Sequence, residues 1–177
     1  GNWIGRMALS KQPSTTSNPL DQLIEHITTI LQNLKITQHT ETQRIGIHSI
    51  LNGENVLLIA PAGSGKTEAC LLPVFHTMLT NGSQKGISVL YITPLRALNR
   101  DMFQRLLYWG QCLNITIQVR HGDTPQSTRR KQALKPPDML ITTPESLQAI
   151  LPGKRIRDHL KNVQWIVVDE IHELVTN

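Results

Sequence analysis

The chain has 177 residues, which suits one domain with a sizeable hydrophobic core. No apolar run reaches the length of a membrane-spanning helix, so the composition argues against a protein that crosses a membrane by helices. The net charge of +5 and the pI near 9.5 tolerate a polyanion such as nucleic acid, whereas an aromatic content of 4% argues against a broad base-stacking platform.

The first 17 residues are small, polar and rich in Ser and Thr, which predicts a flexible arm or tag at 1–17 before one domain at 18–177. The two cysteines, Cys70 and Cys112, are far apart and show no metal-ligand spacing. We therefore expect free thiols, with Cys70 buried on a helix, and a reducing, cytoplasmic setting.

Two helices are predicted next. Apolar residues from Leu20 to Leu34 recur at helical spacing behind Asn18, which can cap the helix. A second helix is expected from about Glu41 to Leu51, with Thr40 as its cap and Gly53 in the left-handed conformation at its end.

A glycine-rich segment, Ala60 to Thr67 (APAGSGKT), lies between an apolar run at 55–59, a predicted strand, and a helical pattern at 68–79. A strand, a glycine loop, Lys-Thr and a helix in this order form a cradle for phosphates. Lys66 would place positive charge at the β- and γ-phosphates, and the Thr67 hydroxyl would ligate Mg²⁺. The alternative is a flexible surface loop with no ligand.

Strands and helices alternate through the rest of the chain, with strands predicted at 87–92, 115–119, 138–142 and 163–168. These strands are uniformly apolar, which is typical of a parallel sheet covered by helices on both faces. The sequence therefore predicts an α/β fold. Ligands of such sheets bind at the carboxyl ends of the strands, where every polar motif of this chain lies.

Asp169 and Glu170 follow the last predicted strand. An aspartate in this setting holds Mg²⁺, directly or through water, opposite Thr67, and the glutamate can accept a proton from water that attacks the γ-phosphate. The alternative is that Glu170 only caps the next helix. Together with the glycine loop, the pair predicts ATP or another nucleoside triphosphate as the ligand.

Other strand ends carry weaker signals. Thr93-Pro94 and Thr143-Pro144 open helices with hydroxyl groups that suit backbone phosphates, and Gly122 permits close approach of a ligand. On these residues alone, ordinary helix caps remain the simpler interpretation. The basic run Arg129-Arg130-Lys131 is more often a solvated helix face than a binding patch, and Gln43 is more often a solvated residue than a reader of adenine.

Six segments in order resemble the motifs of a superfamily 2 DExH-box helicase, in its first RecA-like domain, and are most similar to the Lhr (large helicase-related) group. They are Thr40–Gln43 (the Q motif), Ala60–Thr67 (motif I), Thr93–Asp101 (motif Ia), His121–Thr124 and Thr143–Leu147 (two nucleic-acid-facing motifs), and Asp169–His172 (motif II). The Lhr assignment depends on the forms Pro-Leu-Arg-Ala-Leu, His-Gly-Asp-Thr and Thr-Pro-Glu-Ser-Leu. The resemblance implies a RecA-like P-loop NTPase fold with ATP and Mg²⁺ as cofactors.

The resemblance also assigns residues. Lys66, Asp169 and Glu170 would be catalytic, Thr67 and Asp169 would hold Mg²⁺, and His172 would couple hydrolysis to strand movement. The expected nucleotide contacts are Gln43, Ala62, Gly63, Ser64, Gly65, Lys66 and Thr67, and the expected contacts to a sugar-phosphate backbone are Pro94, Arg96, Gly122, Asp123, Thr143 and Pro144.

The function that this resemblance implies is an ATP-dependent DNA helicase that moves on single-stranded DNA, with an ATP-dependent RNA helicase as the alternative. The expected partners are nucleic acid and a second RecA-like domain of the same full-length chain, and no membrane. A P-loop kinase fits less well because of the Asp-Glu pair and Gln43. Intact Lys66, Asp169 and Glu170 disfavour a module that only binds nucleic acid.

The chain departs from the family pattern at four points. Ala60 replaces the first glycine of motif I, Ala62 replaces a threonine, and no aromatic residue lies just upstream of Thr40. Motif III is also missing, and in this class its strand lies between the phosphate-loop strand and the Asp-Glu strand. We therefore expect a sheet without that central strand, and a fragment that neither hydrolyses ATP efficiently nor unwinds a duplex by itself.

Overall fold

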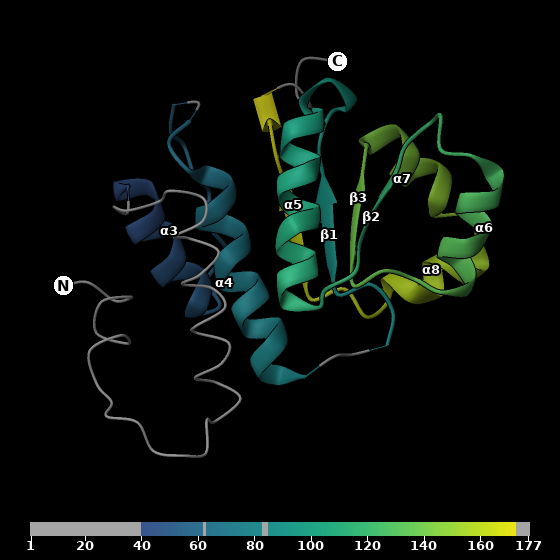
Figure 1. The fold of residues 1–177 in the computed structure, drawn as a ribbon, viewed down its shortest axis with the longest axis horizontal. Coiled ribbons are helices and arrows are strands. Elements are labelled where there is room, and N and C mark those ends of the chain that lie inside the picture. The colour runs from purple at the N-terminus through teal and green to yellow at the C-terminus, as the bar shows by residue number, and fades with distance from the viewer. Residues whose placement is uncertain (1–39, 62, 83–84, 173–177) are drawn as a thin grey trace. The chain divides into compact units, whose positions relative to one another are not determined.

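The computed structural model describes residues 40–61, 63–82 and 85–172 (Figure 1). The chain divides into two compact units, with the boundary between Thr80 and Asn81, and each unit is described by itself. The arm predicted at 1–17 and the helix predicted at 20–34 lie outside the described residues. The division into an arm at 1–17 and one domain at 18–177 stays a prediction.

The first unit contains α3 (Glu41–Leu51), which begins with a reciprocal pair of hydrogen bonds. The Thr40 hydroxyl accepts from the Gln43 backbone N–H at 3.2 Å, and the Gln43 Oε1 accepts from the Thr40 backbone N–H at 3.1 Å. This capping box satisfies two backbone donors that the helix leaves unpaired. At the other end, Gly53 adopts φ +77°, so both predicted ends of the helix are confirmed.

The strand predicted at 55–59 is wrong, because the described structure has no strand there. Leu57 is 67% exposed and Ile59 is 86% exposed. A strand forms only where a neighbouring strand completes its backbone hydrogen bonds, and no described strand pairs with this segment. The apolar composition of residues 55–59 indicates a segment suited to burial. Whether it forms a strand depends on a neighbouring strand that completes its backbone hydrogen bonds.

The second helix of this unit, α4 (Lys66–Asn81), begins two residues before the predicted start. It buries six apolar side chains, those of Ala69, Leu71, Leu72, Pro73, Val74 and Phe75. Cys70 is only partly buried, which corrects the expectation of a buried thiol. Neither Cys70 nor Cys112 forms a disulfide, as predicted.

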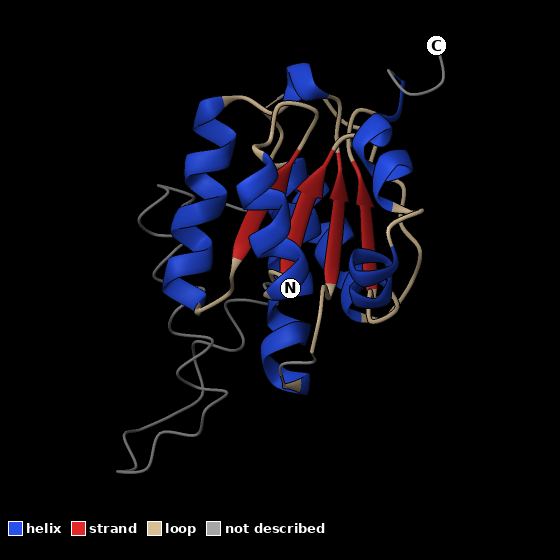
Figure 2. Ribbon diagram, turned by 90° about the vertical axis from the view of Figure 1, so that its right-hand side faces the viewer, coloured by secondary structure: helices blue, strands red, loops and turns tan. Residues whose placement is uncertain are grey.

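The second unit is built on a parallel four-stranded sheet in the order β2-β3-β1-β4 (Figure 2). Its strands are β1 (Val89–Ile92), β2 (Ile117–Arg120), β3 (Met139–Thr142) and β4 (Trp165–Val168). In register, Val89 lies opposite Met139 on one side and Trp165 on the other. The predicted α/β class with a mainly parallel sheet is confirmed.

Helices cover both faces of this sheet, as the apolar strands predicted. In Figure 1, α5 lies on one face and α6, α7 and α8 lie on the other. The bounds are η1 (Leu95–Ala97), α5 (Arg100–Leu113), α6 (Gln126–Leu134), α7 (Pro144–Ile150) and α8 (Lys154–Leu160).

The core of the second unit forms on both faces of the central strands. One cluster joins Leu90 and Leu140 to Ile150 of α7 and Ile156 of α8. On α5, the side chains of Met102, Leu106, Trp109 and Leu113 are buried at helical spacing. Since every residue of β3 is buried, this strand is the centre of the packing and holds the loops at its ends in place.

Gly110 lets the end of α5 pack closely against the chain that returns into β2. A Cβ at this position would lie 2.6 Å from the Ile115 carbonyl oxygen and 3.1 Å from Cδ1 of Ile117. Asn114 then turns the chain with φ +54°, and the Ile115 N–H donates to the Gly110 carbonyl at 2.8 Å. Among the helices of the described ranges, none combines the length and apolarity that a membrane crossing requires.

Candidate nucleotide and nucleic-acid site

The glycine loop leads into α4 with its backbone in an unusual conformation. Gly63 and Gly65 adopt φ values of +75° and +79°, which side chains of L-residues disfavour. The Lys66 ammonium group donates to the Ala60 carbonyl at 2.6 Å, so the lysine closes the loop on itself. Ala62, one of the predicted nucleotide contacts, lies outside the described residues.

The start of α3 holds the same loop from the side. The Thr40 hydroxyl, besides capping its helix, donates to the Ser64 carbonyl at 2.7 Å. Gln43 is only 3% exposed, and its Nε2 would lie 2.2 Å from a Cβ at Gly65. A Cβ at position 65 would force the Gln43 amide to shift, in addition to the strain that φ +79° places on any residue with a side chain.

The geometry of Gln43 bears on its predicted role. Its Oε1 accepts from the Thr40 N–H in the capping box, so half of the side-chain amide is already used. The amide nitrogen faces the Gly65 backbone. Reading of adenine by Gln43 stays a prediction, and it would require this amide to turn or to share its oxygen.

The loop fits a chain of phosphates. The Ser64 hydroxyl is buried and has no hydrogen-bond partner within the described residues, and a Cβ at Gly63 would meet nothing within 4 Å. The Ala69 N–H donates to the Gly65 carbonyl at 2.9 Å, so the helix starts inside the loop. Open space, an unsatisfied hydroxyl, a lysine and a helix N-terminus together suit a polyphosphate anion.

Asp169 and Glu170 follow β4, as predicted. The Asp169 carboxylate accepts two hydrogen bonds, from the Tyr91 hydroxyl at 2.7 Å and from the Glu170 backbone N–H at 2.9 Å. Glu170 adopts φ +52°, a left-handed conformation that few residues other than glycine and asparagine take. Its Oε2 lies 3.2 Å from Nε2 of His172.

The oxygen donors available suit Mg²⁺. Thr67 offers a hydroxyl and Asp169 a carboxylate, which are the hard ligands that this ion prefers. Within the described ranges, no group of three or more acidic, His or Cys side chains is arranged to hold a metal. Mg²⁺ in nucleotide sites is usually bound by one or two protein groups together with phosphates and water, so the Thr67 hydroxyl and the Asp169 carboxylate are each, taken separately, of a type that this ion accepts.

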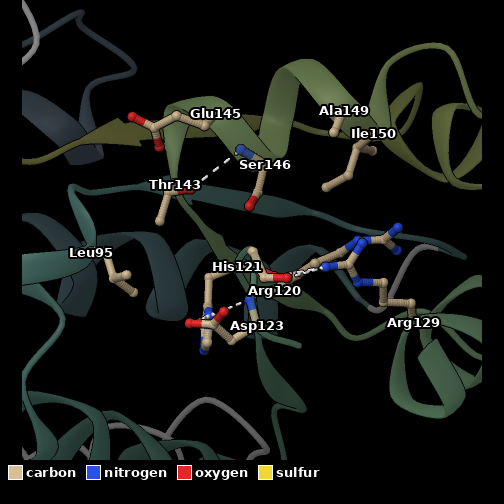
Figure 3. Close-up of a pocket in the computed structure, with 11 residues that line it drawn as sticks. Leu95, Arg120, His121, Asp123, Arg129, Thr143, Glu145, Ser146, Ala149 and Ile150 are labelled. Carbon is tan, nitrogen blue, oxygen red and sulfur yellow. Dashed lines mark hydrogen bonds and ion pairs between the residues drawn. The ribbon is translucent and has the colours of Figure 1, made fainter. Parts of the chain in front are cut away.

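The polar motifs of the second unit meet at one edge of its sheet. Thr93 follows β1, His121 follows β2, Thr143 follows β3 and Asp169 follows β4. Since all four strands are parallel, their carboxyl ends form a single edge, as the sequence predicted. The loops from β2 and β3 surround a hollow of about 410 Å³ (Figure 3).

The hollow brings together three of the predicted nucleic-acid contacts, Gly122, Asp123 and Thr143. Pro94, Arg96 and Pro144, the other three, are not among its lining residues. The residues that line it are Leu95, Arg120, His121, Gly122, Asp123, Arg129, Thr143, Glu145, Ser146, Ala149 and Ile150.

Thr143 caps a helix, which is the simpler of the two interpretations considered for its motif; the other was a contact to a phosphate of nucleic acid. Its hydroxyl accepts from the Ser146 backbone N–H at 3.2 Å at the start of α7. Thr93 differs, because its buried hydroxyl has no hydrogen-bond partner within the part of the chain that the structure describes. Contact of either residue with nucleic acid stays a prediction.

Two arginines of the hollow were missing from the predicted site. Burial, together with the nearby charge of Arg129, lowers the pKa of Arg120. Arg129 belongs to a basic run that we interpreted as a solvated face, yet its guanidinium donates to the carbonyls of Thr124 at 2.8 Å, His121 at 3.3 Å, and Gly122. The available signal was the position of Arg129 in the first turns of the helix behind a polar loop.

The glycine loop before α4 and the parallel sheet with Asp-Glu after its edge strand define the class of protein as a RecA-like P-loop domain. The sequence profile of the DEAD/DEAH box helicase family matches residues 40–177. The chain belongs to this family. The resemblance to helicases that the six motifs carry is thereby confirmed.

Curated relatives include Lhr-type helicases. The ATP-dependent helicase Lhr-Core of Sulfolobus acidocaldarius is 40% identical over 150 residues, an alignment that covers 78% of this chain and 17% of that protein. An ATP-dependent RNA helicase of Candida glabrata is 30% identical over 142 residues, covering 80% of this chain and 26% of the relative. The chain thus spans a small part of the length of these proteins.

Solved structures agree with the fold. The Mycobacterium smegmatis helicase Lhr bound to ssDNA and AMP-PNP matches with a TM-score of 0.71 and 34% identity, over 91% of this chain and 22% of that one. The DUF1998 helicase MrfA bound to DNA and AMPPNP matches with a TM-score of 0.71 and 25% identity, over 93% of this chain and 22% of that one. The RecA-like fold predicted from the motifs is confirmed.

Proposed function

We propose that this chain is the ATP-binding first motor domain of an ATP-dependent helicase that moves on single-stranded DNA. The observation that carries the proposal is the glycine loop at the start of α4, with Gly63 and Gly65 in left-handed conformations, in a chain that belongs to a helicase family. Gly53 and Gly82 have similar φ values in ordinary turns, so the support comes from the combination with the start of α4, the Lys66 ammonium group and the open space at Gly63, which a phosphate cradle needs.

The chemistry is divided among a few side chains. Lys66 would turn from the Ala60 carbonyl to the β- and γ-phosphates and stabilise the charge of the transition state. Thr67 and Asp169 would hold Mg²⁺, which when bound neutralises charge on the phosphates. Glu170 is the proposed base that accepts a proton from the attacking water. The remaining proposed nucleotide contacts are Gln43, Ala62, Ser64 and the two loop glycines.

The proposed strand site is the carboxyl edge of the sheet. The hollow there offers backbone, hydroxyl and arginine groups, which fix a sugar-phosphate backbone without reading its sequence. Pro94, Arg96, Gly122, Asp123, Thr143 and Pro144 remain the proposed contacts. The distance of 3.2 Å between Nε2 of His172 and Oε2 of Glu170 supports His172 as the group that links hydrolysis to strand movement.

DNA is preferred over RNA because the relatives of higher identity are Lhr helicases, and the Lhr structure of Mycobacterium smegmatis contains ssDNA. The RNA helicase from Candida glabrata, at 30% identity, keeps an RNA substrate as the second candidate. Contacts to phosphates alone do not separate the two substrates, since discrimination requires a contact at the 2′-hydroxyl.

The proposed partner within the full-length protein is a second RecA-like domain, which would complete the ATP site. Helicase activity is therefore proposed for the full-length protein, and weak nucleotide binding without efficient hydrolysis for these residues by themselves. Two cysteines outside disulfides are compatible with the proposed cytoplasmic location.

Equilibrium binding tests this function. In the full-length protein that carries this chain, fluorescent ATP and labelled oligothymidylate should both bind, and AMP-PNP should change the affinity for the strand. Lys66→Ala should weaken nucleotide binding by about tenfold or more, because a charge-assisted contact to phosphate is lost. Glu170→Gln should leave nucleotide binding intact, because Glu170 is proposed to act in the chemical step. Loss of nucleotide binding in this variant would show that Glu170 also contributes to binding.

A further inference from the structure

Arg129 reaches from α6 back to the loop that follows β2. Its Nη2 donates to the carbonyls of His121 and Gly122 (Figure 3). Its Nε donates to the Thr124 carbonyl at 2.8 Å. One guanidinium group therefore gathers three carbonyls of four consecutive residues.

We propose that Arg129 is a positioning residue, which holds the loop at 121–124 in the conformation that receives a sugar-phosphate backbone. The inference rests on the proposed function, because it assumes that a strand binds in the hollow. In this account Arg129 acts through the loop, and its own charge need not touch the strand.

The helix that carries Arg129 is itself fixed to the sheet. Gln132, one turn further along α6, is 1% exposed and donates to the Val119 carbonyl in β2 at 2.9 Å. The Ala133 carbonyl lies 2.9 Å from Nε2 of His159 in α8. Both β2 and α8 therefore hold α6 in place. Because α6 is fixed, its Arg129 guanidinium group can fix the loop.

The contacts of Arg129 also orient the backbone of the loop, because carbonyl groups that face Arg129 leave their N–H groups on the opposite side. A trans peptide places its C=O and N–H on opposite sides, so a carbonyl held by Arg129 turns the N–H of the same peptide away from it. The Thr124 carbonyl precedes Pro125, which has no N–H, and the Asp123 N–H donates to Nδ1 of His121 at 3.2 Å, so the Gly122 N–H is the relevant donor. The His121 carbonyl shares a peptide with the Gly122 N–H, and a Cβ at Gly122 would meet nothing within 4 Å. In our proposal the Gly122 amide, turned away from Arg129, is the donor that a phosphate oxygen would approach, and the open space around Gly122 leaves room for it.

Arg129 also removes an unfavourable charge pattern. Three carbonyl oxygens directed into the hollow would repel a phosphate, whereas a guanidinium group in their midst pairs with them and adds positive charge. A lysine cannot reproduce this arrangement, because its three donors spread from a single nitrogen and lack the planar fork.

The chain offers a matched control in Arg130, the next residue of α6, which is exposed. Arg129→Gln and Arg130→Gln remove the same charge from adjacent positions, so a difference between them reports the contacts to the loop. Arg129→Lys keeps the charge and provides a second variant if Arg129→Gln does not fold, which circular dichroism will reveal.

The first measurement needs no nucleic acid. Hydrogen exchange of the full-length protein measures how often two amides of the loop open to solvent. The His121 N–H donates to the Thr124 hydroxyl at 2.9 Å, and the Thr124 N–H donates to the His121 carbonyl at 3.0 Å. In Arg129→Gln these amides should exchange about tenfold faster, because the loop opens more often. Arg129→Lys should give a smaller increase, and Arg130→Gln none. Unchanged exchange in Arg129→Gln and Arg129→Lys would overturn the proposal.

The second measurement is the affinity for labelled oligothymidylate as a function of salt. Arg129→Gln should bind about tenfold more weakly than Arg130→Gln, with the same slope of log affinity against log salt. A slope smaller by about 0.7 in Arg129→Gln alone would indicate a direct phosphate contact and would overturn the positioning role. Equal affinity of the two variants despite a loosened loop would overturn it as well.

The two proposals fail separately. If the wild-type protein binds neither DNA nor RNA, the proposed function is wrong, while hydrogen exchange still tests whether Arg129 orders the loop. If the wild-type protein binds the strand and Arg129→Gln binds as tightly as Arg130→Gln, the proposed function stands and the inference about Arg129 is wrong.

Discussion

The Tyr91 hydroxyl donates to Oδ2 of Asp169 at 2.7 Å, which links the central strand β1 to the residue that follows β4. Tyr91 is 1% exposed and lies opposite Val167 in the register of the sheet, two residues before Asp169. The ring is therefore fixed by the core and directs its hydroxyl at the proposed Mg²⁺ ligand. A partner of this kind orients a metal-binding carboxylate before the ion arrives.

Tyr91→Phe should raise the Mg²⁺ concentration needed for half-maximal binding of fluorescent ATP by about threefold to tenfold. The free energy of unfolding should fall by about 1 kcal/mol, because one hydrogen bond is lost. Titration of Mg²⁺ at constant nucleotide measures the first effect and urea unfolding the second. Tyr108→Phe on α5 is the control, and an equal shift in both variants would contradict the role given to Tyr91.

Gly65→Ala should disrupt the phosphate loop. The left-handed conformation alone costs about 1–2 kcal/mol for a residue with a side chain, and the new Cβ would also meet Gln43 at 2.2 Å from Nε2. Gly82→Ala is the matched control, since Gly82 has φ +82° and open space around its Cβ. Binding of fluorescent ATP should be lost in the first variant and retained in the second; retention in both would argue against this loop as the nucleotide site.

Gly110→Ala tests the packing that supports the β2 loop. Since its Cβ would lie 2.6 Å from a backbone oxygen, α5 or the start of β2 must shift, and the free energy of unfolding should fall by about 1–3 kcal/mol. Gln111→Ala, at an exposed neighbouring position, should change it by less than about 0.5 kcal/mol. Chemical denaturation of both variants makes the comparison, and equal stability would show that the close approach at Gly110 is not required.

Stability should depend on pH through His76 of α4. Burial lowers the pKa of His76 below its ordinary value of 6.5, so the unfolded chain binds a proton more readily than the folded one. Stability should fall as the pH drops through 6.5 and become constant once folded His76 is also protonated. His76→Gln should flatten the curve of unfolding free energy against pH in this range, and an unchanged curve would exclude His76 as its source.

The features that the sequence predicted best are local ones. The Thr40 cap, the left-handed Gly53 and the Thr143 cap depend on neighbours within a few residues, and the structure confirms all three. The placement of motifs at strand ends was predictable because apolar strands alternate with helices, which allows few arrangements other than a parallel sheet.

The features that the sequence did not predict depend on distant partners. The apolar run at 55–59 has the composition of a strand, but a ladder requires a neighbour that no sequence pattern guarantees. Arg129 and Arg130 look alike in the sequence, and only the path of the loop at 121–124 separates a residue with three carbonyl partners from an exposed one. The hydrogen bond from Tyr91 to Asp169 spans 78 positions and leaves no periodic signal.

The most direct test of the central claim is the ATPase rate of the full-length protein with no nucleic acid, with single-stranded DNA and with single-stranded RNA. DNA should stimulate hydrolysis by about tenfold or more, and Glu170→Gln should abolish the stimulated rate, since loss of a general base costs about 10²–10⁴-fold. Stimulation by RNA alone would replace the DNA substrate with RNA. An ATPase rate that neither nucleic acid changes would contradict a motor that couples hydrolysis to movement on a strand.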